Sequence, residues 1–427
     1  MTAFTLAAAA ALGGPEWLRS GRVAAAERFA SAVLPTEADE IWRYSRISQL
    51  DLEAYAPLPA DAVRPGIPSE IKAVLAAAGP HSALVVVRDG HVTSVNCDPA
   101  LAAKGLVVDD LVVGQPALAG NGREALDDGT AAADAFTELN RAFLGAAVVI
   151  DVPAGLVVPE PILVLHWIGS DDAAIFPRTV VRCSADSQVT VVEHHGSADV
   201  SAFVDPVVHL DVGEAARLQY LNVQVLGPRV FQIGYQSSRV GRDASLSSSV
   251  VALGGDYARM RTDSVIDGKG GSTKLNAAYL ADGRRMHDFR TLQDHAAPAS
   301  SSDLLFKGAV QDNARSVYSG LIRVRKEARG TNAFQTNRNL VLSEGASAES
   351  VPNLEIETED VRCSHASAVG PVNEEQRYYL EARGIPPVVA ERLIVAGFLG
   401  EVLDRLPSTP LVTGIRATLA DRLSHTT

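Results

Sequence analysis

The chain has 427 residues, of which 47% are hydrophobic and 21% charged, so it can bury a large core as two or three domains or as one long architecture. Its 38 basic and 51 acidic side chains give a net charge of −13, which argues against general binding to nucleic acid or to anionic membrane surfaces. Three widely spaced cysteines without a CxxC pair argue against a disulfide framework or a thiolate-rich zinc module, and are typical of a reducing cytosol.

Residues 1–147 are predicted to form a mixed, largely helical domain. Ala24–Leu34 has helical character, and Asp134–Leu144 has the apolar spacing of an amphipathic helix. Between them, two valine-rich runs around Asp89-Gly90 predict a β-hairpin. No Lys or Arg precedes the alanine-rich start, which favours a helix over an export signal, and no apolar run is long enough to span a membrane. We therefore expect a cytoplasmic protein.

Residues 148–368 are predicted to form a parallel β-helix. Short β-rich runs with period-2 alternation follow one another between turns, and no long helical pattern intervenes. In a weak repeat, an apolar residue precedes an Ala or Gly by four positions. The small residues recur at steps near multiples of about 14, as if each arm of a coil used that many residues. The pairs are Val212/Ala216, Val240/Ala244, Ile266/Gly270, Val310/Ala314, Val324/Ala328 and Leu342/Ala346. A β-sandwich with irregular hairpins is the competing interpretation.

Residues 369–427 are predicted to form a C-terminal helical domain. Asn373 and Gln376 fit a capping box, Gly384 fits a helix stop, and Pro386-Pro387 fits the start of a second helix. That second helix has two apolar stripes, which must be covered by the protein itself or by a partner. The first stripe consists of Val389, Leu393, Ala396, Leu399, Leu403 and Leu406, and the second of Ile394, Phe398 and Val402.

The most interesting candidate chemistry lies at Cys363 and His365. Positions i and i+2 of a strand share a face, so a thiolate and an imidazole would lie about 7 Å apart and could hold iron or a sulfur species. A buried structural cysteine beside a surface histidine is the alternative. The adjacent His194 and His195 point to opposite faces of a strand, so we expect a surface or turn role and not a shared metal. Gly268–Lys274 does not fit a nucleotide-binding loop, so we expect a tight turn and no bound nucleotide.

Short motifs along nearly the whole chain match one protein family, in order. They are Glu40-Ile41-Trp42-Arg43-Tyr44, Leu139-Asn140-Arg141-Ala142-Phe143, Val152-Pro153, Asp294-His295-Ala296-Ala297-Pro298, Lys307-Gly308, Gly320, Gln335-Thr336-Asn337-Arg338-Asn339, Arg362-Cys363-Ser364-His365-Ala366, Val369-Gly370, Asn373-Glu374-Glu375, Tyr378-Tyr379-Leu380 and Arg383-Gly384-Ile385. With these motifs the chain resembles the SufB/SufD family of the SUF iron–sulfur cluster assembly system. The SufD side is favoured, because SufB usually carries a Glu-His-Glu-Ala type segment where this chain has Cys363–Ala366, and a cysteine at the position of Asn337.

The resemblance implies a right-handed parallel β-helix flanked by helical segments. It also implies a scaffold without enzyme activity of its own, which pairs with SufB through the β-helix and binds the ABC-type ATPase SufC through its C-terminal helices. A transient iron–sulfur cluster is expected at the SufB–SufD interface, with His365 as a transient iron ligand and Cys363 as a weaker candidate. It leaves open whether a flavin binds to the complex. The residues expected to contact SufC are Tyr378, Leu393, Ile394, Phe398 and Val402.

Three alternatives stay open on the sequence. In the first alternative, the chain is a SufB-type paralogue of the same family. In the second, it is a purely structural partner whose Cys-x-His segment is inert. The third comes from a different class, the β-helix carbohydrate-active enzymes. Such an enzyme needs an export signal, a groove with paired carboxylates and often aromatic platforms, whereas aromatic residues make up only 5% of this chain.

Overall fold

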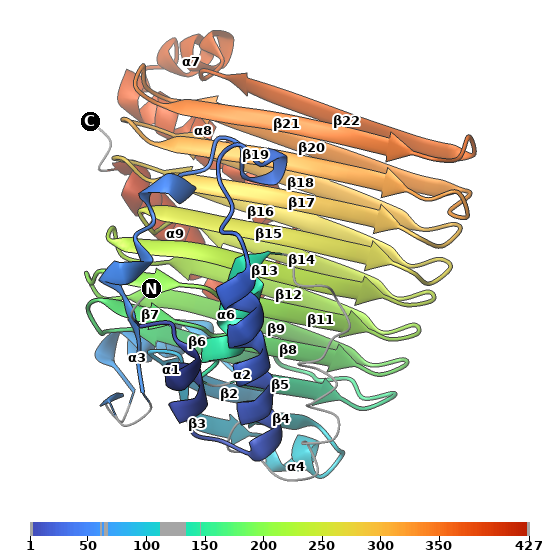
Figure 1. The fold of residues 1–427 in the computed structure, drawn as a ribbon. Helices are drawn as coiled ribbons and strands as arrows, with labels where there is room; N and C mark the ends of the chain where they lie inside the picture. Colours follow the sequence, from blue (N-terminus) through green and yellow to red (C-terminus); the bar gives the residue numbers. More distant parts are fainter. Residues whose placement is uncertain (1–2, 60–61, 64–66, 112–133, 146, 425–427) are drawn as a thin grey trace.

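The computed structural model describes residues 3–59, 62–63, 67–111, 134–145 and 147–424. Its strands stack into a β-solenoid of about eight turns, with helices toward both ends of the chain (Figure 1). Among the described strand pairs, only β2 with β3 and β4 with β5 are antiparallel. The prediction of a parallel β-helix is therefore confirmed, and the competing β-sandwich is wrong.

Two long sheets form the walls of the solenoid. Sheet A contains, in spatial order, β21 (Ser347–Ile356), β19 (Arg315–Val324), β17 (Met286–His295), β15 (Tyr257–Ile266), β13 (Val230–Val240), β11 (Val207–Val212), β8 (Arg178–Cys183), β5 (Ala147–Val152) and β4 (Val107–Asp110), with the short β1 (Ala56–Pro57), β7 (Ala173–Ile175) and β10 (Ala202–Val204) beside this path. Sheet B contains β22 (Val361–Gly370), β20 (Thr331–Val341), β18 (Ser301–Val310), β16 (Ser272–Ala281), β14 (Ser245–Ala252), β12 (Arg217–Val225), β9 (Gln188–Ser197), β6 (Ile162–Ile168), β2 (Ala83–Arg88) and β3 (His91–Cys97). The predicted hairpin around Asp89-Gly90 is β2 and β3, and β2 joins sheet B by parallel pairing with β6.

One coil takes close to 28 residues, as the predicted repeat indicated. Val212, Val240 and Ile266 lie side by side on β11, β13 and β15. Ala216 and Ala244 then follow at the corner where the chain passes from sheet A to sheet B, and both are buried. Other members of the repeat, such as Ala314 and Ala346, lie at the opposite corner, which explains steps near 14 rather than 28.

The corners between sheets A and B form a ladder of their own. In each coil one corner residue has a positive φ, and its N–H donates to a carbonyl of the next corner along the solenoid. Glycine takes up this left-handed conformation without steric cost, and aspartate tolerates it better than most residues. These corner residues are Gly155, Asp186, Ala215, Asp243, Gly270, Ala299 and Gly330.

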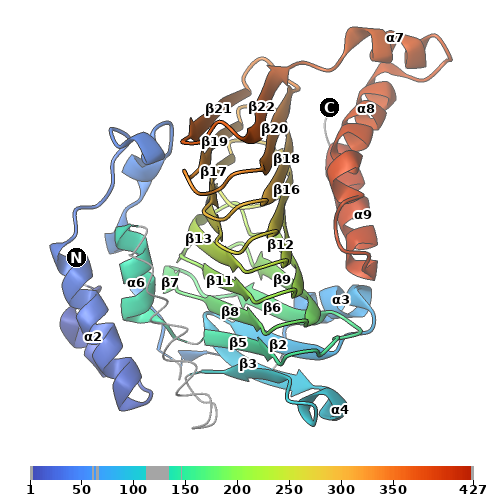
Figure 2. The ribbon, with the colours of Figure 1, turned by 90° about the vertical axis from the view of Figure 1, so that its right-hand side faces the viewer.

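The N-terminal helices cover the outer face of sheet A (Figure 2). They are α1 (Leu6–Ala11), α2 (Glu16–Ser31), α6 (Ala135–Phe143) and the 3-10 turns η1 (Glu40–Trp42), η2 (Ile47–Gln49) and η3 (Leu52–Ala54). The helix predicted at 134–144 is confirmed, and its N-cap Asp134 forms a capping box with Thr137. The helix predicted at 24–34 begins earlier, at Glu16, and ends at Ser31. It does not extend to the predicted end, because the residue before a proline, here Leu34 before Pro35, disfavours helical backbone.

Trp42 anchors the segment that follows α2. Its side chain is 2% exposed, and the guanidinium of Arg259 lies 3.8 Å from its ring centroid. Arg259 and Arg290 both donate to backbone carbonyls of this segment and both bind the buried carboxylate of Asp288, at 2.7 and 2.6 Å. Burial alone would raise the pKa of Asp288, but the two arginines hold this pKa below its usual value. The Trp42-Arg43-Tyr44 motif therefore ties the N-terminal segment to sheet A.

The C-terminal helices cover the outer face of sheet B (Figure 2). Here α8 (Pro387–Leu403) and α9 (Pro410–Ser424) share one apolar core with the sheet and with α3 (Ser69–Ala78). Lys307 on β18 pairs with Glu401 of α8, and its amine lies 4.4 Å from the ring centroid of Phe398. The preceding α7 (Glu374–Glu381) starts at the predicted N-cap and buries none of its residues, and α4 (Pro99–Ala102) is a single turn. Among the described helices, none combines the length and apolar character needed to cross a membrane.

Candidate functional site

The solenoid ends in two edge strands, β21 in sheet A and β22 in sheet B, at the same end of the molecule (Figure 1). We call these two strands the open end. Each pairs with only one strand among the described residues. An unpaired edge presents free N–H and C=O groups, which makes it a template for pairing with another chain. The exposed apolar side chains of Val351, Ile356 and Val369 add to this surface.

Cys363 and His365 lie on β22 at the open end and share one face, as predicted. In the parallel register with β20, Cys363 lies beside Ala333 and His365 beside Gln335. Ala333 and Gln335 are both buried, so the shared face of β22 is the one turned toward the solenoid interior. Cys363 packs partly against the last apolar cluster of this interior, whereas His365 is exposed.

Cys363 and His365 differ in how well they can bind iron. Burial raises the pKa of the Cys363 thiol, and the protonated thiol is not the form that ligates metals. His365 carries an imidazole, a good ligand for iron in its neutral form, at a position accessible from outside the chain. Two residues further on, Ser367 donates to Ser350 of β21 at 2.7 Å and ties the two edge strands together. His365 is therefore the better placed of the pair for a site shared with a second chain.

The five residues expected to contact SufC do not lie on one surface. Tyr378 on α7 is 74% exposed, and Leu393 on α8 is 50% exposed. Ile394 and Phe398 are partly buried against sheet B, and Val402 is fully buried there. The second apolar stripe of α8 is thus covered by the protein itself at Val402 and in part at Ile394 and Phe398, and the accessible apolar surface lies around Tyr378 and Leu393.

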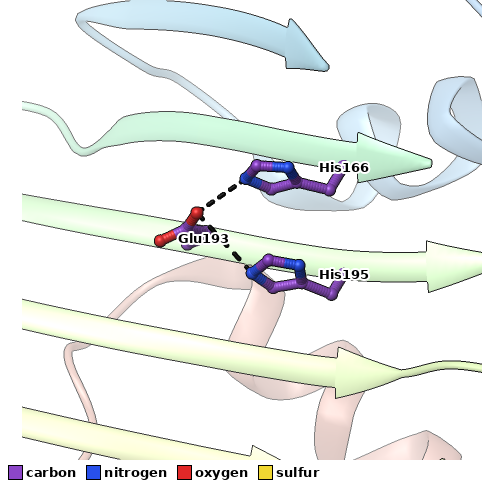
Figure 3. A group of neighbouring side chains, drawn as sticks. All are labelled: His166, Glu193 and His195. Carbon is purple, nitrogen blue, oxygen red and sulfur yellow. Dashed lines mark hydrogen bonds and ion pairs between the residues drawn. The ribbon is translucent and has the colours of Figure 1, made fainter. Parts of the chain in front are cut away.

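A second group of ligand-type side chains lies inside the solenoid, on the neighbouring strands β6 and β9 (Figure 3). Glu193 Oε1 lies 2.6 Å from His166 Nε2 and 3.6 Å from His195 Nε2. The two imidazole rings stack with their centroids 4.2 Å apart. All three residues are buried, and one ligand atom of each lies within 4.8 Å of the others. A carboxylate and two imidazoles in this arrangement can share a proton or hold a cation.

Glu193 is fixed in place by its neighbours. Thr179 on β8 donates to Glu193 Oε1 at 2.8 Å, and Tyr220 on β12 donates to Oε2. Burial would raise the pKa of Glu193, but the hydrogen bond from His166 and the adjacent imidazole of His195 hold this pKa well below its usual value. Burial lowers the pKa of His166. At neutral pH the group therefore contains an ionised carboxylate beside a neutral imidazole of His166.

This buried group was not predicted from the sequence. The surface or turn position expected for His194 and His195 is wrong, because both are buried within β9. Their opposite orientation is confirmed, since His194 lies beside Leu165 of the outer core and His195 beside His166. The available signal was the spacing of Glu193 and His195, two residues apart on a strand, with His166 one coil earlier.

The family model described as "SUF system FeS cluster assembly, SufBD core domain" matches residues 166–398, from β6 into α8. The chain belongs to the SufB/SufD family. An iron–sulfur cluster assembly SufBD family protein of Mycobacterium tuberculosis is 36% identical over 303 residues, which cover 69% of this chain and 73% of that protein. SufD of Escherichia coli is 28% identical over 306 residues, or 70% of this chain and 72% of that protein. SufD of Bacillus subtilis is 27% identical over 412 residues, or 92% and 91%.

Membership of the SufB/SufD family connects the chain to iron–sulfur cluster assembly in the SUF system and confirms the resemblance seen in its motifs. The alternative of a carbohydrate-active enzyme is therefore set aside. The matched core includes the buried His166, at its first residue, and the open end with Cys363 and His365. Family membership by itself assigns a role to none of these side chains.

Proposed function

We propose that this chain is a scaffold subunit of the SUF machinery that pairs through its open end with a SufB-type paralogue. The observation that carries the proposal is the position of His365, an exposed imidazole on β22, the edge strand of sheet B that pairs only with β20 among the described residues. A nascent cluster forms between the two chains, with His365 as a transient iron ligand that contributes to iron entry and Cys363 as its neighbour. A site divided between two proteins can open and release a labile cluster.

A SufD-type role is favoured over a SufB-type role by the side chain at position 337. Asn337 is fully buried and donates to the hydroxyl of Tyr279 at 3.3 Å. Asn339 in turn donates to Asn337 Oδ1 at 2.9 Å, and Tyr279 donates to Asn339 Oδ1 at 2.6 Å. The position at which the resemblance implies a cysteine in SufB is thus occupied here by a hydrogen-bonded amide. This hydrogen-bond network supports a structural role for position 337 in this chain, with no thiolate offered there.

The C-terminal segment 369–427 binds a SufC-type ATPase in this proposal, through the exposed side of α7 and α8 around Tyr378 and Leu393. ATP hydrolysis then belongs to the partner, and this chain has no enzymatic activity of its own. Segment 1–147 supplies helical cover and the strands β1 to β4 at one end of the solenoid, and segment 148–368 supplies the rest of the β-helix core. The chain acts in the cytoplasm, which is consistent with three cysteines that are all free thiols.

Affinity capture of the tagged chain from its native cells tests the proposal. We expect an ABC-type ATPase and a paralogous β-helix protein to be captured together with the chain. Val369→Asp places a charge on the open end, so the variant should no longer capture the paralogue but should still capture the ATPase. As a matched control, Val95→Asp on β3, at the other end of sheet B, should keep both. Recovery of neither protein with a folded chain would contradict the proposal.

A further inference from the structure

The group formed by His166, Glu193 and His195 is distant from the open end. It lies on β6 and β9, and five strands of sheet B separate β9 from β22. The proposed pairing through His365 therefore makes no use of it. Within a solenoid whose first coils are filled mainly by valine and leucine, three ionisable side chains that converge on one point need a physical reason.

We propose that His166, Glu193 and His195 bind one divalent transition-metal ion of the zinc or ferrous type. Two imidazole nitrogens and one carboxylate oxygen are ligands that these ions share, whereas magnesium and calcium prefer oxygen ligands alone. Each of the three side chains is buried, and each offers one ligand atom to the same small volume. The proposal does not depend on the partners proposed above.

The distances agree with a metal site that needs only a small adjustment. Two ligands of one tetrahedral ion lie about 3.4 Å apart, since each is roughly 2.0–2.2 Å from the metal. His195 Nε2 lies 3.6 Å from Glu193 Oε1, close to this separation. His166 Nε2 lies 2.6 Å from the same oxygen, a hydrogen-bond distance, so binding requires this pair to open by about 0.8 Å. The atoms on both sides are ends of side chains, which can move by that amount.

A second observation points to a ligand between His195 and Glu193. His195 Nε2 is buried and has no hydrogen-bond partner in the described part of the chain, although it faces the Glu193 carboxylate (Figure 3). An imidazole nitrogen left unsatisfied in a dry interior costs free energy. An ion between His195 and Glu193 would satisfy this atom, whereas the hydrogen bond of His166 alone does not.

The surroundings of the group also resemble those of metal sites. Ligating carboxylates are commonly oriented by hydrogen bonds from residues that do not touch the metal. Thr179 and Tyr220 provide such bonds to Glu193, one on each carboxylate oxygen. The ion itself would connect two neighbouring strands, β6 and β9, and the hydrogen bonds of Glu193 extend from there to Thr179 in sheet A and to Tyr220 in the next coil of sheet B. Three protein ligands leave a fourth position for water or an exchanging ligand.

The test measures metal binding by the full-length chain alone. The purified chain is stripped of metal and titrated separately with Zn²⁺, with Fe²⁺ under anaerobic conditions, and with Co²⁺ as a spectroscopic probe. We expect one equivalent of ion to bind, a rise in the melting temperature, and for Co²⁺ the visible absorption of a site with nitrogen and oxygen ligands. Preference for Zn²⁺ or for Fe²⁺ decides between the two ions, and either result supports the site.

Two variants and one matched control assign the ligands. His195→Gln and Glu193→Gln should each lower the affinity for the ion by more than about tenfold. The control is His194→Gln, which changes an adjacent buried histidine of the same strand on the opposite face and should leave the affinity unchanged. Failure of the folded wild-type chain to bind any of the three ions would overturn the proposal, even if the variants do not fold. Equal affinity in His195→Gln and wild type, or equal loss in His194→Gln, would also overturn it.

Discussion

Replacement of His365 by alanine should lower the iron and sulfide content of the reconstituted complex with the SufB-type paralogue and the ATPase at least about tenfold, since loss even of residues that only orient metal ligands costs roughly 10–100-fold in metal affinity. The physical reason is that His365 offers the exposed imidazole of the open end, whereas the neighbouring thiol of Cys363 is held protonated by burial. The stability of the chain should change by about 1 kcal/mol or less, as for other exposed side chains. The measurement is iron and sulfide analysis alongside gel filtration.

Cys363→Ser is the matched comparison, because it changes the other candidate ligand on the same face of β22. It should reduce cluster content less than His365→Ala if Cys363 is only a neighbour, and equally if both residues bind iron. Normal cluster content in His365→Ala would contradict the proposed role of His365. Loss of the complex itself would show that His365 packs the interface between the two chains and does not act as an iron ligand.

Leu393→Glu should weaken binding of the SufC-type ATPase at least about tenfold, which corresponds to about 1.4 kcal/mol. Leu393 is 50% exposed on α8, so the proposed contact would have to bury the new carboxylate. Glutamate is a good helix former, and the chain itself should remain folded, with a change in stability within about 0.5 kcal/mol. Calorimetry or surface-based binding with the purified ATPase measures the effect. An affinity equal to that of the wild type would rule out this side of α8 as the contact.

A change on the buried side of α8 provides the contrast. Leu399 is 1% exposed and packs against sheet B, so Leu399→Ala should destabilise the chain by about 2–5 kcal/mol through the cavity it leaves. Removal of the whole segment after Gly370 would uncover the apolar outer face of sheet B and should give an insoluble protein. Truncation therefore does not separate ATPase binding from folding, whereas the pair Leu393→Glu and Leu399→Ala does.

The solenoid could be predicted because its signals are local and repeated. Alternating residues mark each strand, and small residues such as Ala216 and Ala244 recur at corners one coil apart. Every coil repeats the same physical requirement, a buried inner face and a tight turn, so weak signals add along the chain. The same-face placement of Cys363 and His365 follows from strand geometry alone, which is why that prediction is confirmed.

The buried metal-ligand group and the burial of α8 depend on contacts between distant segments. His166 meets His195 only through the register between β6 and β9, and an error of one residue would place them on opposite faces. The second stripe of α8 was recognised as apolar, but only the packing against sheet B shows that Val402 is covered by the chain itself. Periodicity therefore predicts which residues are apolar, whereas three-dimensional packing decides what covers them.

Hydrogen exchange of the backbone amides, compared between the chain alone and its complex with the SufB-type paralogue, tests whether the two chains pair through the open end. We expect exchange to slow in β22 and β21, because pairing satisfies the free edge N–H groups of the open end, and to stay unchanged in β3 at the other end of sheet B. Protection confined to β3, or to the N-terminal helices on sheet A, with no change in β22 would contradict pairing through the open end and with it the shared site at His365.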